Sequence, residues 1–306
     1  MYQFSTTLSQ ALASNAKQRV LLEFFKRPNG AAYNPVVQFS NEDILISDGI
    51  RLTTEFNSET DVAIGLCPSA ELQFKMLNDE GQLENFDFGR FRAYLGAAIT
   101  EGTPSSAAKT KTFTENGEDV LYEFAPLGTF IAQKPDIVKV AIIDVDANDQ
   151  MILFDEDMPT LSVTYPTTIY AITSELCSRV GVSLKESSWL NSNLTVAAEP
   201  KQFANATMRE VLGWIAEAGG SNARFTRNGY LEFAWFTPIN KTYDEHDYAD
   251  FTPTWYATKT IDGLHIRNAD STSEFVVGGS SNAYMIQDNP FLRQDDSEEE
   301  EGGGGT

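Results

Sequence analysis

The sequence predicts a mainly β protein in which two small antiparallel β-barrel-like domains flank a helix-helix-hairpin domain. Short runs that alternate apolar and polar residues, separated by turn residues, recur through residues 20–155. Two amphipathic helical patterns and a strand-turn-strand pattern follow in residues 160–240, and further β-prone runs appear in residues 245–293. Many short strands with regular turns favour a barrel or sandwich over βαβ units, and the two helices with their hairpin form an α+β module.

This pattern divides the chain into five parts. A weakly helical segment over residues 1–19 precedes the first β-barrel-like domain, residues 20–155. The α+β module occupies residues 160–240, and a second β-barrel-like domain, which we expect to be incomplete, occupies residues 245–293. Residues 294–306 read QDDSEEEEGGGGT, and we expect this tail to be disordered because it has no apolar area to bury.

The strands of the two β domains are predicted from alternation and from turn residues. Leu72, Phe74 and Met76 alternate with polar residues, which predicts a strand with one solvent-exposed face. Residues 100–118 are polar and rich in Thr, Ser and Gly, which predicts a long hairpin loop at the surface. The expected strands are residues 20–25, 50–56, 69–76, 90–95, 119–124, 139–145, 254–260, 263–267 and 273–277.

The two helices of the α+β module are marked by apolar stripes and end signals. The first begins near Pro166 and ends before Gly181, and its apolar face consists of Ile169, Ile172, Leu176 and Val180. The second begins at Thr207, which forms a capping box with Glu210 three residues later. Gly219 and Gly220 end the second helix, and its apolar stripe consists of Met208, Val211, Leu212 and Ile215.

A β-hairpin is predicted directly after the second helix. Residues 223–226 and 230–236 are β-prone, and Asn228-Gly229 lies between them. This dipeptide suits a two-residue type I′ turn, which needs positive φ at both central positions.

Composition excludes several classes of protein. The chain has 306 residues, 42% of them hydrophobic, and a formal net charge of -22. That charge argues against nucleic acid as a partner, because phosphate recognition needs clustered Lys and Arg. No apolar run is long enough for a transmembrane helix, so we expect no stable membrane insertion, and the first residues do not resemble a signal peptide. Cys67 and Cys177 are the two cysteines, and their apolar surroundings predict buried free thiols.

Some acidic residues and the two histidines are candidate catalytic or metal-binding groups. Asp144, Asp146 and Asp149 resemble part of a calcium loop, but position six of an EF-hand needs Gly and is Asp149 here. A solvated strand end is the better interpretation of these residues. The two histidines, His246 and His265, are far apart in sequence and do not form a zinc motif. We therefore predict that the chain is not an enzyme and has no catalytic, cofactor-binding or metal-binding residue.

Exposed aromatic residues could stack on sugars, and this possibility stays open. Trp214, Trp235, Trp255 and Tyr256 are the candidates, although a core or interface role is favoured for all four.

Several short motifs occur in an order that resembles phage tail-hub proteins. This family includes the baseplate hub of contractile tails and the N-terminal hub part of siphophage tail-associated proteins. The resemblance spans about residues 20–292. Its motifs are S-N-E-D-I at residues 40–44, I-G at 64–65 followed by Ser69, Glu71-Leu72, Phe74, Leu77-Asn78, Gly81 and Leu83, P-L-G-x-F at 126–130, the region of Asp144 to Met151, the helix from Thr207 with R-x-x-L-x-x-I-A-E-A, the hairpin Phe225-x-Arg227-x-Gly229-x-Leu231, and N-P-F-L at 289–292.

The resemblance implies a structural protein of a phage or phage-like tail tip or baseplate. A hub of this family is a homotrimeric ring that joins the tail tube to the tip or spike. The implied partners are further copies of the chain, the tail tube or distal tail protein, the tape-measure protein and the tip or spike protein. The chain would be assembled in the bacterial cytoplasm and located in the virion tail.

Two other functions stay open at this point. The chain could be a carbohydrate-binding β-sandwich used in host adsorption, which need not form a ring. It could also be an enzyme acting on cell wall, which would need a cleft with matched carboxylates. With 44 acidic residues in the chain, a pair of carboxylates by itself says little.

Overall fold

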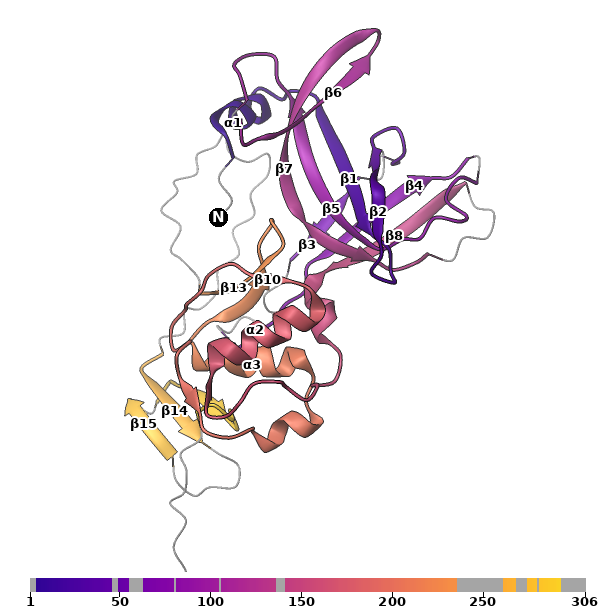
Figure 1. The fold of residues 1–306 in the computed structure, drawn as a ribbon. Helices are drawn as coiled ribbons and strands as arrows, with labels where there is room; N and C mark the ends of the chain where they lie inside the picture. The colour runs from indigo at the N-terminus through magenta and orange to yellow at the C-terminus, as the bar shows by residue number, and fades with distance from the viewer. Residues whose placement is uncertain are drawn as a thin grey trace, which may run out of the picture.

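The computed structural model describes residues 4–45, 49–54, 63–79, 81–104, 106–135, 141–235, 261–267, 274–279 and 281–292. Within these ranges the protein is mainly β, with three α-helices. A large sheet lies at one end, helices α2 and α3 lie in the middle, and strands β14 to β16 lie at the other end (Figure 1). The expectations for residues 254–260 and for the tail, residues 294–306, fall outside the described residues.

The large sheet has eight strands and is antiparallel throughout. Its order is β2-β1-β5-β7-β8-β4-β3, and β6 pairs with β7 beside this path. The strands are β1 (Gln18–Lys26), β2 (Ala32–Ser40), β3 (Arg51–Thr53), β4 (Glu71–Leu77), β5 (Arg90–Ala98), β6 (Lys109–Glu115), β7 (Glu118–Ala132) and β8 (Ile142–Asp149).

The sequence predicts a barrel-like domain, but the sheet is not closed into a barrel. Within the described residues, its end strands β2 and β3 do not pair with each other. The chain after β2 instead forms an antiparallel bridge between Ile44 and Met76 of β4. The N–H of Leu77 donates to the carbonyl of Asp43 at 2.8 Å. The S-N-E-D-I segment therefore brings the β2 end of the sheet to β4.

The core of the large sheet is rich in phenylalanine. Phe24 and Phe91 are fully buried and stack with ring centroids 4.6 Å apart, and Phe88 contacts Phe24 edge-on at 6.1 Å. Such aromatic pairs stabilise a core beyond the area that they bury. The alternation predicted in β4 is confirmed, since its buried residues are Leu72, Phe74 and Met76, each at most 3% exposed.

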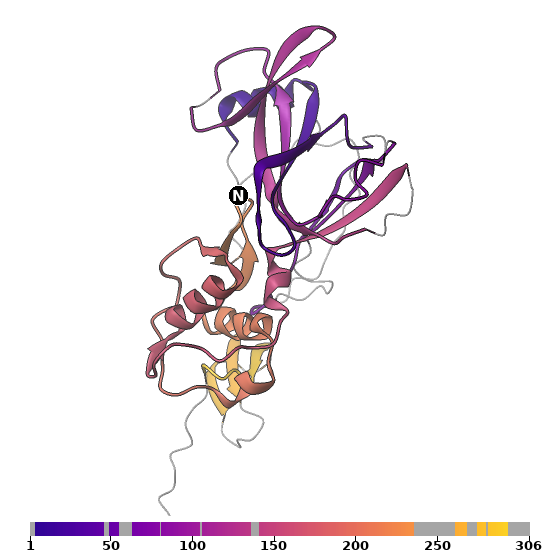
Figure 2. The same ribbon diagram turned by 45° about the vertical axis from the view of Figure 1, so that its right-hand side comes forward.

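The predicted loop over residues 100–118 is wrong in part. Residues 109–115 form strand β6, which pairs with β7 along its whole length and makes a two-stranded arm at the top of the molecule (Figure 2). Arg19, which is only 4% exposed, contacts the arm toward its turn and lies 4.0 Å over the ring of Phe113. Arg19 also pairs with Glu42 and Glu115, each at 2.6 Å. Polar composition alone did not reveal this strand, because a ribbon exposed on one face needs few apolar residues.

The N-terminal segment contains helix α1 (Thr6–Ala13), in agreement with its weak helical pattern. Ser5 is the N-cap, and its hydroxyl accepts a hydrogen bond from the N–H of Leu8. Leu8 and Ala11 pack against small residues of β5 and β7, so the helix covers one face of the large sheet.

The α+β module contains both predicted helices. Helix α2 (Ile169–Val180) begins after its N-cap Thr168 and ends at Gly181 with φ of 68°. Helix α3 (Met208–Ala218) has the predicted capping box of Thr207 and Glu210. The apolar stripe of α3 is buried in the module core, where Leu212 and Ile215 are fully buried.

Short elements complete the module. Strands β10 (Ser183–Leu184), β12 (Asn222–Phe225) and β13 (Tyr230–Ala234) form one sheet, while β9 (Thr167–Thr168) pairs with β11 (Thr195–Val196). Two 3₁₀ turns, η2 (Gln150–Phe154) and η3 (Lys201–Asn205), supply further core residues. The chain passes directly from β8 into η2, whose Met151 and Phe154 are fully buried in the module core.

The C-terminal strands form a small sheet of order β15-β14-β16. They are β14 (Gly263–Arg267), β15 (Glu274–Gly278) and β16 (Ala283–Gln287), with β14 and β16 parallel. Two of the three strands expected in this part are therefore found where they were predicted. The division of the chain into domains stays a prediction.

The β12–β13 hairpin is present, but its turn differs from the predicted type I′. Gly229 has φ of 82°, whereas Asn228 is not at positive φ. Phe225 pairs with Leu231, and the N–H of Gly229 donates to the carbonyl of Thr226 at 2.9 Å. This is a three-residue loop that ends on a left-handed glycine. The strand register decides the turn type, because Leu231 is buried in the core and pairs with Phe225.

We expect Gly229→Val to destabilise the protein strongly and Asn228→Asp to leave its stability nearly unchanged. A β carbon on Gly229 would be strained at positive φ, which costs about 1–2 kcal/mol. It would also lie 2.6 Å from Oγ1 of Thr129. Asn228 is exposed and carries neither constraint. Urea midpoints of the two variants decide the question, and equal midpoints would contradict this account of the turn.

Candidate functional site

The aspartates considered for calcium do not converge on one point. Asp144 and Asp146 are exposed on β8, as a solvated strand requires, whereas Asp149 is buried at its end. Asp149 accepts hydrogen bonds from the Ser69 hydroxyl at 2.9 Å and the Met151 N–H at 3.0 Å. Burial raises the pKa of Asp149 despite these bonds. Among the described residues, no group of three or more His, Cys, Asp or Glu side chains is arranged to hold a metal ion.

The histidine and cysteine side chains are also separated. Nδ1 of His265 lies 2.9 Å from Oε1 of Glu274 across the β14–β15 pair, and His246 lies outside the described residues. Cys67 and Cys177 are free thiols, and burial raises the pKa of each to about 12. Thiols protonated at neutral pH are poor nucleophiles.

Two of the four candidate sugar-stacking aromatics are described by the structure. Trp214 is half-buried in the module core, and Trp235 is 46% exposed. Trp255 and Tyr256 lie outside the described residues. A stacked pair that the sequence did not indicate is Trp189 on Phe233, with ring centroids 4.4 Å apart.

The large sheet and the α+β module are joined by the segment that precedes β4. Residues 63–67 run beside β12, with the N–H of Gly65 donating to the carbonyl of Ser221 at 2.8 Å and the N–H of Ala223 donating to that of Leu66 at 2.9 Å. The side chain of Asn222, itself 1% exposed, accepts from the N–H of Leu66 at 2.9 Å. The I-G motif therefore adds a strand-like segment to the module sheet.

Two glycines allow this segment to lie directly on α3. Gly65 has φ of 81°, and a β carbon on it would lie 2.9 Å from Cβ of Glu217. A β carbon on Gly213 of α3 would lie 2.9 Å from the carbonyl oxygen of Gly65. Backbone meets backbone here, so neither position has room for a side chain.

We expect Gly213→Ala to lower the free energy of unfolding by about 1–3 kcal/mol through overpacking. In a helix without this contact the same change would be stabilising by about 1 kcal/mol, because Ala is the better helix former. The sign of the change in a chemical denaturation experiment therefore reports the contact. A stabilised variant would show that the segment does not lie on α3.

The N-P-F-L motif fixes the chain after β16 to the same helix. Asn289 is 1% exposed, and its Nδ2 donates to the carbonyl of Trp214 and to Oε2 of Glu217, both at 2.9 Å. Its Oδ1 accepts from the N–H of Phe291, which is buried in the module core. Burial raises the pKa of Glu217, and the bond from Asn289 opposes that shift.

We expect Glu217→Gln to stabilise the protein at neutral pH and to have little effect in acid. Burial raises the folded-state pKa of Glu217 above its unfolded value, which is about 4.3. The protonated side chain therefore stabilises the folded state. This contribution to stability is fully present below the unfolded pKa and is lost as pH rises through the folded pKa. Gln keeps an acceptor for Asn289 and carries no charge. Melting temperatures of both proteins between about pH 4 and 8 test this. A difference that does not grow with pH would contradict it.

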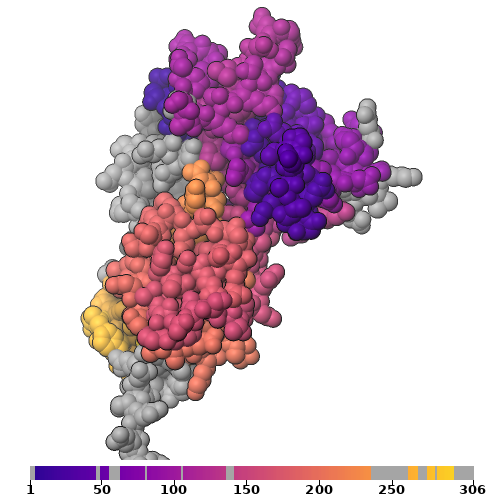
Figure 3. Space-filling view, in the orientation of Figure 1, coloured from indigo at the N-terminus to yellow at the C-terminus, as the bar shows by residue number. Residues whose placement is uncertain are grey.

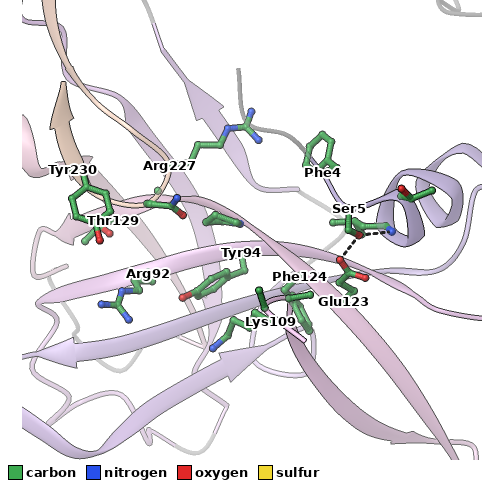
Figure 4. Close-up of a pocket in the computed structure, with 17 residues that line it drawn as sticks. Phe4, Ser5, Arg92, Tyr94, Lys109, Glu123, Phe124, Thr129, Arg227 and Tyr230 are labelled. Carbon is green, nitrogen blue, oxygen red and sulfur yellow. Dashed lines mark hydrogen bonds between the residues drawn. The ribbon is translucent and has the colours of Figure 1, made fainter. Parts of the chain in front are cut away.

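A groove of about 770 Å³ opens between α1, the face of β5 and β7, and the β12–β13 turn (Figure 4). The tip of the hairpin lies near the end of β8, where Nε2 of Gln150, the first residue of η2, donates to the carbonyl of Gly229 at 2.9 Å. In the space-filling view the tip of this hairpin fills part of the narrow region between the two halves of the molecule (Figure 3). The charged and aromatic side chains that line the groove include Phe4, Arg92, Tyr94, Lys109, Glu123 and Arg227.

The electrostatics of the groove differ between its parts. Lys109 lies 4.8 Å from the ring centroid of Tyr94 and 2.8 Å from Oε1 of Glu23. Burial, followed by the charge of Glu23, raises the pKa of Tyr94 to about 12, so its phenol stays protonated at neutral pH. Arg92, over the ring of Phe25 at 4.9 Å, is exposed.

Glu123 lies at the α1 end of the groove and is only 2% exposed. One carboxylate oxygen accepts from the hydroxyl of Ser5, the N-cap of α1. The other oxygen, Oε2, has no hydrogen-bond partner among the described residues.

The chain is similar in fold outline to solved phage tail proteins. One is the 43 kDa tail protein of prophage MuSo2 from Shewanella oneidensis, with 14% identity and a TM-score of 0.44 over 89% of this chain and 72% of that chain. Another is prophage tail protein gp18 from Listeria monocytogenes EGD-e, with 10% identity and a TM-score of 0.43 over 88% and 71%. A tail protein from Neisseria meningitidis MC58 has 10% identity and a TM-score of 0.37 over 78% and 71%.

No family model matches the chain, and no curated protein matches it. At identities and TM-scores this low, the likeness to the solved tail proteins carries no conclusion about what the chain does. Among the described residues, no helix has the length and apolar composition needed to cross a bilayer.

The groove was not predicted from the sequence. Its residues come from five separate stretches of the chain, and no single stretch carries a recognisable binding motif. One signal was present: Glu123 interrupts a nearly continuous apolar run in β7. A carboxylate in a strand that is buried on both faces needs a polar partner. For Glu123 this partner is Ser5, the N-cap residue of α1.

Proposed function

We propose that the chain is a structural component of a phage or phage-like tail tip or baseplate. In this proposal three copies form a hub ring that joins the tail tube to the tip or spike. The chain performs no catalysis and requires no cofactor. Its partners would be the tail tube or distal tail protein, the tape-measure protein and the tip or spike protein, and its location would be the virion tail.

One observation carries the proposal: the residues of the hub-like motifs make the contacts that fix the sheet, the module and the C-terminal strands to one another. Gly65 of the I-G motif lies against α3, and Ser69 bonds to Asp149. Gly229 lies against Thr129 of β7, and Asn289 bonds to α3. These motifs are far apart in sequence, and each of them joins one part of the fold to another. This shared structural role favours a common fold with the hub proteins over chance similarity of sequence.

We expect the purified protein to have a mass near three chains, about 100 kDa, since one chain is 33.8 kDa. Copies joined head to tail form closed rings when the rotation between them closes. Light scattering or sedimentation at micromolar and higher concentrations measures the mass. A strict monomer at every concentration, with or without the partner tail proteins, would count against a self-assembling hub.

The same preparation separates the hub from the carbohydrate-binding alternative. A host-adsorption module would bind glycans whatever its mass, and its exposed Trp235 would be the first residue to test. Saturable glycan binding by a monomer, lost on Trp235→Ala, would favour that alternative. Ring formation without glycan binding would favour the hub.

A further inference from the structure

We propose that the groove between α1, β5–β7 and the β12–β13 turn binds an acidic polypeptide segment, residues 294–301 of a second copy of this chain. The inference deepens the proposed function and rests on it in one respect, since the copies must meet. It assigns the groove a ligand class and a specific contact between copies.

The charge of the groove differs from that of the chain as a whole. The chain has 44 acidic and only 22 basic residues, yet three cationic side chains line this one groove. Lys109 is already paired with Glu23. Arg92 and Arg227 are exposed and make no ion pair with any described residue. Two guanidinium groups at one groove favour a carboxylate-rich ligand, because Arg binds carboxylates in a bidentate manner.

One buried carboxylate oxygen at the groove needs a hydrogen-bond donor. Oε2 of Glu123 is buried at the α1 end of the groove and has no hydrogen-bond partner in the part of the chain that the structure describes. A buried acceptor without a donor costs free energy, so a ligand that brings a donor is favoured. A polypeptide has a backbone N–H at nearly every residue, in addition to its carboxylates. A phosphate polymer offers acceptors along its backbone and would leave Glu123 unpaired.

The sequence of residues 294–301 supplies the groups that such a groove favours. Residues 294–301 read QDDSEEEE, with six carboxylates, a serine hydroxyl and an amide. The segment therefore has the anions that Arg92 and Arg227 require and donors for Glu123. Its composition makes it the strongest concentration of negative charge in the sequence.

The place where the described C-terminal strands end favours a neighbouring copy as the source of the segment. Strands β14 to β16 lie at the end of the molecule away from α1, and the chain after β16 is fixed to α3 by Asn289 (Figures 1 and 2). The groove lies beside α1 (Figure 4). A segment that follows Leu292 thus starts far from the groove of its own chain, which favours the groove of a neighbour. Contacts of this kind are head-to-tail and can close into a ring.

The direct test uses a fluorescent peptide of sequence QDDSEEEE and the full chain, with anisotropy as the readout. We expect saturable binding that weakens at least about tenfold when Arg92→Glu and Arg227→Glu are combined, since each charge-assisted hydrogen bond is worth more than a neutral one. Binding should also weaken as salt is raised from about 50 to 500 mM. The peptide QNNSQQQQ should not bind.

Matched controls separate this contact from general effects. Arg51→Glu changes an exposed arginine of β3, outside the groove, and should leave peptide binding unchanged. Thermal melts of each variant show that it is folded. Absence of saturable binding, equal binding of the Gln-containing peptide, or unchanged binding by the double variant would each overturn the proposal. Equal or tighter binding of polyphosphate would overturn a polypeptide as the ligand.

Sedimentation of the full chain then tests the second copy as the source of the segment. We expect Arg92→Glu with Arg227→Glu to weaken association, and the added changes Glu298→Lys, Glu299→Lys and Glu300→Lys to restore it. Trimers that are indifferent to both sets of changes would overturn the groove contact and leave the hub standing. A chain that binds the peptide but stays monomeric would overturn the hub ring and leave the acidic-segment site standing.

Discussion

The close approach of Gly65 to Gly213 sets the position of the α+β module against the large sheet. Because the backbone of residues 63–67 lies directly on α3, the segment can add to the edge of the module sheet and then continue into β4. A larger side chain at either glycine would separate the two layers. Further contacts join the large sheet to the module.

Three of those contacts come from different parts of the chain. Arg90 of β5 donates to the carbonyls of Val180 and Gly181, where α2 ends, and cations are favoured at that end of a helix. The 3₁₀ turn after β8 places Met151 and Phe154 in the module core. The hairpin tip at Gly229 lies on β7. The sheet and the module are therefore joined by backbone and by core residues, in addition to surface polar bonds.

The groove is a consequence of the same arrangement. The hairpin contacts β7 at Thr129, and α1 packs near Ala125 of the same strand. The face of the sheet between these two contacts stays open. At its α1 end, Oε2 of the buried Glu123 has no hydrogen-bond partner among the described residues. Elsewhere in the groove, Arg92 and Arg227 are exposed. A ligand for this groove must bring carboxylates for the two arginines and a hydrogen-bond donor for Glu123. An acidic polypeptide has both kinds of group.

The sequence by itself determined the elements whose physics is local. The alternation around Phe74, the capping box of Thr207 and Glu210, and the glycine after α2 each act within a few residues, so helices α2 and α3, strand β4 and the hairpin were all predictable. Tertiary structure decided the rest. Strand β6 depends on pairing with β7, and the turn at Gly229 depends on the register that buries Leu231. The role of Gly213 and the groove around Glu123 depend on segments that are distant in sequence, and no local pattern specifies which distant backbone a residue will meet.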